Sequence, residues 1–154
     1  MKVLLRAPLL TLSGYGIHSR QIFEWLESIP GIQLTTECVP WGKTAWIINQ
    51  EQDNKIIQRI MNCSKRTEKE TNYDYSFQVQ LPDEWDPTLA KVNVGVSAFV
   101  ETDRCSKAWI DNSNKMDAVV VPSTFTKNVA KRSGDLTTPI YVIPEWYNDK
   151  IEEV

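Results

Sequence analysis

The chain has 154 residues, enough for one domain with a core of ordinary size. Apolar residues make up 42% and charged residues 24% of it, which is normal for a soluble globular protein. The formal net charge of −3 gives no basic footprint, so a nucleic-acid partner is disfavoured. No apolar run approaches the ~20 residues that a transmembrane segment needs, and Arg6 and Pro8 interrupt the N-terminus too early for a signal peptide.

The cysteines and the single histidine exclude the common metal motifs. Cys38, Cys63 and Cys105 are odd in number, widely spaced and form no CxxC pair. With His18 as the only histidine, no zinc or other metal site is indicated. Three unpaired thiols are typical of a cytoplasmic protein, and we expect that location. Three of the six tryptophans stand beside Gly, Pro or Asp and are expected in loops: Trp41, Trp85 and Trp146.

The first half of the sequence predicts alternating strands and helices. Residues 2–6 form a short apolar run that is typical of a buried parallel strand. After a loop at 7–16, a helix is expected from Tyr15, with an apolar face and a Pro-Gly stop: Ile22, Phe23, Leu26, Ile29, then Pro30 and Gly31. The next predicted segments are a strand, an ambiguous stretch interpreted as a loop with a short strand, and a helix: 32–39, 40–48 and 50–63.

The second half continues the alternation after a charged loop at 64–72. Predicted strands cover 73–80, 92–100, 118–121 and 140–143, and predicted helices cover 104–114 and 124–133. A loop at 81–89 and an irregular tail from Pro144 complete the chain. Strands alternating with helices predict one Rossmann-like, doubly wound, mostly parallel α/β domain over residues 1–154.

Ligands of such sheets bind outside the carboxyl ends of the strands. Right-handed crossovers bring the loops that follow the strands to one edge of the sheet. Five segments are therefore expected to line a common cleft: 7–18, 81–91, 101–105, 122–126 and 144–148.

Three segments, in this order and spacing, resemble the N-terminal domain of GT-B glycosyltransferases of the group 1 type, which are mostly retaining enzymes. The Gly-rich loop that opens the first helix and the final strand with its proline are the less specific ones: Ser13-Gly-Tyr-Gly-Ile-His-Ser-Arg20 and Pro139-Ile-Tyr-Val-Ile-Pro144. The specific one is Glu101-Thr-Asp103…Trp109…Asn114-Lys-Met-Asp117-Ala-Val-Val-Val-Pro122-Ser123-Thr-Phe125. The resemblance spans nearly the whole chain.

The resemblance implies transfer of a sugar from a nucleotide-sugar donor to a sugar or other hydroxyl acceptor. In the family the N-terminal domain mainly holds the acceptor, and the C-terminal domain holds the donor through a Glu-x7-Glu pair. Val154 stands about where that second domain would start, so we expect donor binding to need a separate domain or subunit, and the chain alone to be inactive. No metal or other cofactor is implied. Glu145 and Glu153 show the same spacing, which we interpret as coincidence.

The Gly-rich loop supplies the first candidate binding residues for an acceptor or a phosphate: Gly14, Tyr15, Gly16 and His18. The glycines allow a ligand to approach the backbone, or serve only a tight turn. His18 sits near a helix N-terminus, which disfavours the imidazolium and suits a neutral hydrogen-bonding role. The alternative is a histidine that only packs at the surface.

The strand ends supply the other candidates. Glu101 is the candidate catalytic residue, because a carboxylate at a buried strand end can accept hydrogen bonds from hydroxyls or assist proton removal. Asp103 could contact a ligand, although capping of the next helix is favoured, and Ser123 is expected to be an N-cap that could also bind an anion. Trp146 could stack on a sugar or cover a domain interface. Glu145 departs from the family, where a histidine and then a glycine often follow this proline.

Two other functions stay open at this point. The chain could be a non-enzymatic Rossmann-like module that binds a sugar, a nucleotide or a protein. A fragment of a nucleotide-sugar epimerase is less favoured, because the first loop is not G-x-G-x-x-G and no acidic residue follows at the appropriate strand end.

Overall fold

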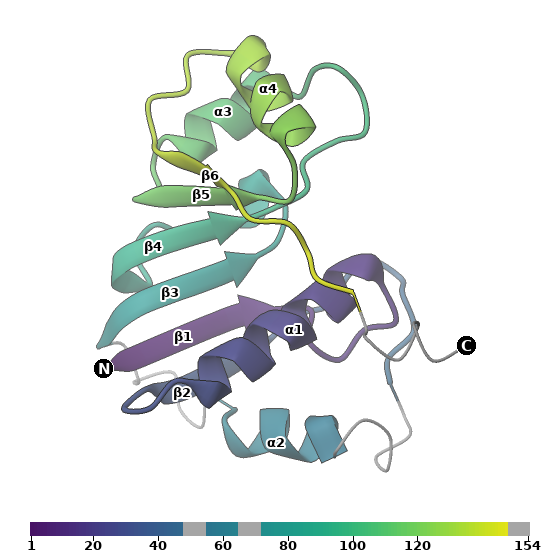
Figure 1. Cartoon of the computed structure of the whole chain (residues 1–154), viewed down its shortest axis with the longest axis vertical. Helices are drawn as coiled ribbons and strands as arrows, with labels where there is room; N and C mark the ends of the chain where they lie inside the picture. Colours follow the sequence, from purple (N-terminus) through teal and green to yellow (C-terminus); the bar gives the residue numbers. More distant parts are fainter. Residues whose placement is uncertain (48–54, 65–71, 148–154) are drawn as a thin grey trace.

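The structure is a computed structural model that describes residues 1–47, 55–64 and 72–147. Its described residues form an α/β fold around a six-stranded sheet in the order β2-β1-β3-β4-β5-β6, and every neighbouring pair is parallel (Figure 1). The Rossmann-like doubly wound class predicted from the sequence is confirmed. The strands are β1 (Lys2–Ala7), β2 (Gln33–Cys38), β3 (Tyr73–Val79), β4 (Ala90–Val96), β5 (Ala118–Val121) and β6 (Ile140–Val142).

The described helices flank this sheet. They are α1 (Gly14–Ser28), α2 (Ile56–Asn62), the 3₁₀ turn η2 (Pro82–Glu84), α3 (Lys107–Ser113) and α4 (Thr124–Ser133). The predicted helix at 50–63 is confirmed over α2, and its first residues, 50–54, lie outside the described residues, as does most of the predicted loop at 64–72. None of the described helices combines the length and apolar character needed to cross a membrane.

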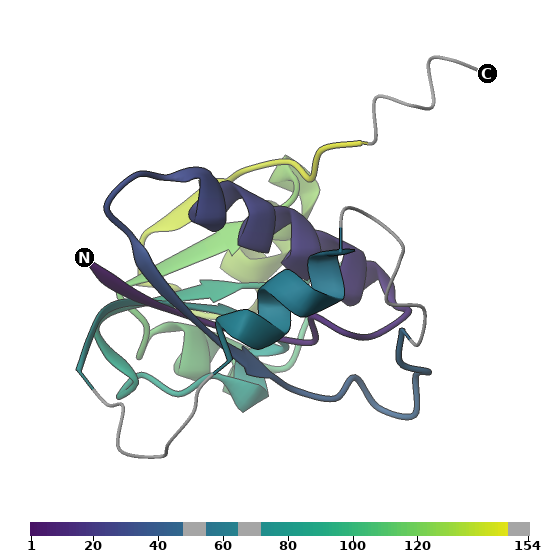
Figure 2. The ribbon, with the colours of Figure 1, turned by 90° about the horizontal axis from the view of Figure 1, so that it is seen from below.

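Strand alternation divides the core between the two faces of the sheet. On one face Val3 and Leu5 of β1 pack with Phe23 of α1. On the other face Val119 and Val121 of β5 pack with the remaining members of a second cluster, from η2, α3, α4 and their loops: Trp85, Phe99, Ile110, Met116 and Ala130. On the first face α1 and α2 lie side by side (Figure 2), joined by Arg59 to Glu24 at 3.2 Å and to Glu27 at 3.0 Å.

Two predicted boundaries on either side of residue 100 are wrong. β4 ends at Val96 and does not continue to 100. The Ala98 N–H donates to the Tyr15 hydroxyl at 3.0 Å and not to a neighbouring strand, and Phe99 has a left-handed backbone with φ 56°, which a strand does not allow. The chain then runs as a loop to Ser106, whose side chain accepts the Ala108 N–H as the N-cap of α3. The expectation that Asp103 caps this helix is therefore wrong, since α3 begins at Lys107 and not at 104.

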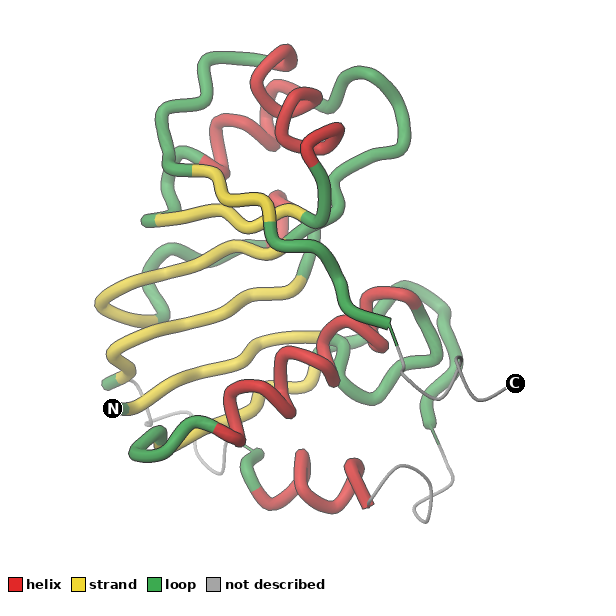
Figure 3. Tube along the Cα trace, viewed as in Figure 1, coloured by secondary structure: helices red, strands yellow, loops and turns green. Residues whose placement is uncertain are grey.

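The connection from β3 to β4 carries no α-helix (Figure 3). Buried amides hold it against the sheet instead. Gln78 donates to the Asp86 carbonyl at 2.7 Å and accepts from the Asp86 N–H at 2.8 Å. The Asn93 amide donates to the carbonyls of Pro87 and Ala90 and accepts from Ser76 Oγ and the Ala90 N–H. These hydrogen bonds hold the connection against the sheet in the place where a βαβ unit would have its crossover helix.

Candidate functional site

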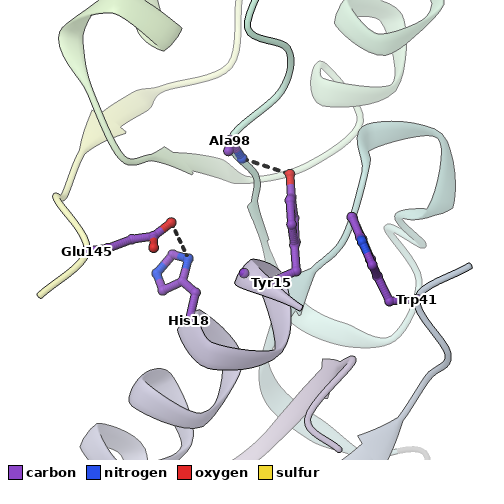
Figure 4. A pocket seen from close by; sticks show the side chains of 6 residues that line it. Tyr15, His18, Trp41, Ala98 and Glu145 are labelled. Carbon is purple, nitrogen blue, oxygen red and sulfur yellow. Dashed lines mark hydrogen bonds and ion pairs between the residues drawn. The ribbon is translucent and has the colours of Figure 1, made fainter. Parts of the chain in front are cut away.

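A pocket of about 210 Å³ lies where the sheet topology favours ligand binding. The strand order reverses direction between β1 and β3, and α/β sheets bind ligands outside the strand carboxyl ends at such a point. Each lining residue comes from a segment that follows a strand: Gly14, Tyr15, His18, Trp41, Ala98 and Glu145 (Figure 4).

One wall of the pocket is aromatic. The rings of Tyr15 and Trp41 stack with centroids 4.0 Å apart and planes 19° from parallel (Figure 4). Backbone bonds between the loops after β1 and β2 fix Trp41 in place: the Leu12 N–H donates to the Ala45 carbonyl at 2.9 Å, and the Ile47 N–H donates to the Leu10 carbonyl at 2.8 Å. The stretch interpreted as a loop with a short strand thus contains one antiparallel bridge, and this bridge positions a pocket residue.

The Tyr15 hydroxyl is used within the protein. It accepts the Ala98 N–H at 3.0 Å and shares a hydrogen bond of 3.0 Å with Ser97 Oγ. Burial raises the pKa of Tyr15 above its usual value, while the bonds to Ser97 and Ala98 oppose this rise. The hydroxyl therefore stays protonated and ties α1 to the end of β4. Tyr15 offers a ligand its ring and not a free hydroxyl.

The opposite wall is polar. His18, in the second turn of α1, places Nδ1 3.2 Å from Glu145 Oε1 (Figure 4). Burial lowers the pKa of His18, and the Glu145 carboxylate partly offsets this decrease. The segment that carries Glu145 is also held to α1 by Gln21 Nε2, which donates to the Trp146 carbonyl at 2.6 Å. The chain after β6 thus closes the pocket by returning to α1.

The histidine–glutamate contact gives a pH prediction. We expect His18 to titrate below the usual histidine pKa of about 6.5. Because the folded-state pKa is the lower one, folded-state stability is complete above about pH 6.5 and falls as the pH drops through the folded pKa. In Glu145→Gln the pKa of His18 should fall further, since the carboxylate that raises it is gone. Proton NMR of the chain's one histidine measures both values without assignment, and an unchanged or higher pKa in Glu145→Gln would contradict the contact.

The two glycines of the first helix have separate roles. Neither has a positive φ, so the tight-turn alternative is wrong for both. Gly14 lines the pocket, and a Cβ built on it would meet nothing within 4 Å. Gly16 is buried against the Thr11 backbone, and its N–H donates to the N-cap Ser13 Oγ at 2.9 Å. Only Gly14 is therefore placed to contact a ligand.

The other predicted site residues lie outside the lining of this pocket. Glu101 and Asp103 are exposed on the loop between β4 and α3. Ser123 is the N-cap of α4, as expected, and accepts the Thr126 N–H at 3.1 Å. The Trp146 side chain is exposed, and its backbone carbonyl accepts the hydrogen bond from Gln21 Nε2.

Sequence reasoning missed Trp41 and Ala98 as pocket residues. It named Glu145 as a departure from the family and for its spacing from Glu153, and it named His18 as a candidate, but it did not predict that the two side chains meet. A tryptophan next to Gly42 in a loop after a strand was the available signal for Trp41.

The described residues contain neither a cluster of metal-binding side chains nor a disulfide. No group of three or more His, Cys, Asp or Glu side chains there could hold a metal ion. The three cysteines are free and partly buried. Burial raises the pKa of the Cys38 thiol to about 11, so this thiol stays protonated at neutral pH and is a poor nucleophile.

Comparison with protein-family models, curated proteins and solved structures finds no significant match to the chain. The function is therefore inferred from the pocket. It combines an aromatic wall, a histidine held by a glutamate and a helix N-terminus at the ligand-binding edge of the sheet.

Proposed function

We propose that this chain is the acceptor-side domain of a two-domain glycosyltransferase and that its pocket binds a sugar acceptor. The observation that carries the proposal is the pairing of the Tyr15–Trp41 stack with the His18–Glu145 pair across one small pocket. A sugar ring has an apolar C–H face and a rim of hydroxyls, and these two walls complement both. The volume of about 210 Å³ is below the roughly 300–1,000 Å³ of drug-sized sites, which suits a single sugar unit.

In this proposal His18 receives the acceptor hydroxyl. Its lowered pKa keeps the imidazole neutral near pH 7, so one ring nitrogen can accept a hydrogen bond from that hydroxyl. Glu145, 3.2 Å from Nδ1, orients the ring and would stabilise it if it takes up the proton. Burial and the carboxylate together set both the orientation and the protonation state of this side chain.

The donor half lies elsewhere in this proposal. A separate C-terminal domain or subunit binds the nucleotide sugar and closes over the carboxyl edge of the sheet. Glu101, exposed on the loop after β4, would then reach the reacting sugar only in the closed enzyme. We place the reaction in the cytoplasm, which agrees with three free thiols.

The test is sugar binding by the purified chain. A panel of monosaccharides and methyl glycosides is titrated while tryptophan fluorescence and NMR shifts are followed. We expect saturable binding that Trp41→Ala weakens about two- to tenfold, since loss of one aromatic contact costs roughly 0.5–1.5 kcal/mol and 1.4 kcal/mol is tenfold. Trp46→Ala is the matched control: it changes an exposed tryptophan of the same loop that is not a lining residue of the pocket.

Four results would contradict the proposal or a part of it. If no sugar binds, or if Trp41→Ala binds as tightly as the unchanged chain, the pocket is not an acceptor site. Binding of a free nucleotide alone would favour the non-enzymatic module. Turnover of UDP-, GDP- or ADP-sugars by the chain without a second domain, lost in Glu101→Ala, would show that one domain carries a complete site.

A further inference from the structure

The charged groups that act on the pocket are acids. Glu145 lines the pocket, and its side chain is 42% exposed, so its carboxylate is open to a ligand as well as to His18. Burial raises the pKa of the Tyr15 hydroxyl, and the negative charges of Glu145 and of Glu84 in η2 raise it further, so both carboxylates act on this wall. None of the described residues that line the pocket is a lysine or an arginine. The pocket therefore has a negative electrostatic potential.

The N-terminus of α1 opposes this potential without cancelling it. A helix N-terminus carries about half an elementary positive charge, which is less than the full charge of one carboxylate. The Gly16 N–H of this first turn already donates to Ser13 Oγ at 2.9 Å. His18 adds no positive charge near pH 7, because burial lowers its pKa. An anionic ligand would thus meet Glu145 with no lysine or arginine among the described lining residues to compensate.

The aromatic wall faces the carboxylate across the pocket. In Figure 4 the Tyr15 ring lies between Trp41 and the histidine–glutamate pair. Trp41 covers one face of the Tyr15 ring, with the ring centroids 4.0 Å apart, and the other face is turned toward the pair. The face of an aromatic ring is negative and attracts a cation, and a carboxylate attracts the same cation from the opposite side. Together these two groups are suited to an organic ammonium ion.

We propose that the sugar acceptor carries an amino group, which binds as an ammonium ion between the Tyr15 ring and the Glu145 carboxylate. This inference rests on the proposed function, in which the pocket holds a sugar. His18 Nδ1 contacts Oε1 of Glu145, which leaves Oε2 to accept a hydrogen bond from the ammonium. A protonated amine has no lone pair with which to attack the donor sugar. The amino group therefore serves recognition, and the reacting group remains a hydroxyl at His18.

Pairs of sugars that differ in one charge test the proposal. Methyl glycosides with one amino group at C2, C3, C4 or C6 are titrated against the purified chain at pH 7. Each is compared with its parent glycoside, which has a hydroxyl of similar size at the same carbon. We expect at least one amino sugar to bind about tenfold or more tightly than its parent. Methyl glucuronide, which is anionic, should bind more weakly than methyl glucoside.

The variant Glu145→Gln separates the charge of this side chain from its shape. The amide can still accept a hydrogen bond from His18 Nδ1, so the parent glycosides should bind nearly as before, whereas the preference for the amino sugar should fall below about twofold. Glu24→Gln is the matched control, because it makes the same change on α1 at a side chain that is 46% exposed and is not a lining residue of the pocket. It should keep the full preference. The preference is a ratio of two Kd values for one variant, so partial unfolding does not imitate its loss.

The possible results distinguish this inference from the proposed function. If amino and parent glycosides bind equally, or if Glu145→Gln keeps the preference, the inference is overturned while the acceptor function is retained. Cyclohexylmethylamine, an ammonium ion without a sugar, covers the opposite case. If it binds and Glu145→Gln abolishes this binding while no sugar binds, the ammonium site is supported and the acceptor function is wrong. If neither it nor any sugar binds, both are wrong.

Discussion

Replacing Gly16 by alanine should destabilise the fold by about 3 kcal/mol, the upper part of the range for overpacking a rigid site. A Cβ at this position would lie 2.8 Å from Thr11 Oγ1 and closer still to the Thr11 carbonyl oxygen. The carbonyl cannot move freely, because it accepts a hydrogen bond from Arg20 at 3.0 Å, and the Thr11 side chain is fully buried. Urea unfolding followed by tryptophan fluorescence measures the change.

Gly14→Ala is the matched control for this prediction. Gly14 lies two residues earlier in the same helical turn, and its added Cβ would meet nothing within 4 Å. Alanine favours the helix over glycine by up to about 1 kcal/mol, so the variant should be as stable as the original chain or slightly more stable. Equal destabilisation by the two substitutions would show that helix geometry, and not the contact with Thr11, explains the glycine at position 16.

The sequence predicted those elements whose formation depends on local pattern. α4 was expected at 124–133 and occurs there, because Ser123 supplies a side-chain cap and the helix ends before Gly134. β5 was expected at 118–121 and occurs there, since a short β-branched run suits a buried parallel strand. Hydrophobic period and capping residues act within a few positions of the chain, so one sequence is sufficient to identify them.

The parts that were missed depend on contacts between distant segments. Nothing close to Trp41 in the sequence indicates that it stacks on Tyr15, 26 positions earlier, because the bridge between Thr11 and Trp46 places it there. His18 and Glu145 meet only because the chain after β6 returns to α1. β4 ends early where the Ala98 N–H donates to the hydroxyl of Tyr15, 83 positions earlier, and where Phe99 has a left-handed backbone that no local propensity favours.

Replacing Asn93 by aspartate should destabilise the fold by at least about 3 kcal/mol, although the side chain keeps its shape. Asn93 is 2% exposed, and its Nδ2 donates to the Pro87 carbonyl at 2.8 Å and to the Ala90 carbonyl at 2.9 Å. A carboxylate oxygen in that place would face both carbonyl oxygens without a proton to share. The Asp117 carboxylate, which accepts the Asn93 N–H at 2.7 Å, adds repulsion between like charges.

The pH dependence of Asn93→Asp distinguishes this cause from a general packing defect. Burial and the neighbouring carboxylate raise the pKa of the introduced acid in the folded state above its unfolded value of about 3.9. The folded variant then binds a proton more tightly than the unfolded chain, so its deficit in stability should shrink as the pH falls from 8 to 5. Asn62→Asp, the same change at the exposed end of α2, should cost less than about 1 kcal/mol. If the loss of stability in Asn93→Asp does not change with pH, the two carbonyl oxygens and not the charge reject the substitution. If this loss is no larger than that in Asn62→Asp, the buried amides do not hold the β3–β4 connection to the sheet.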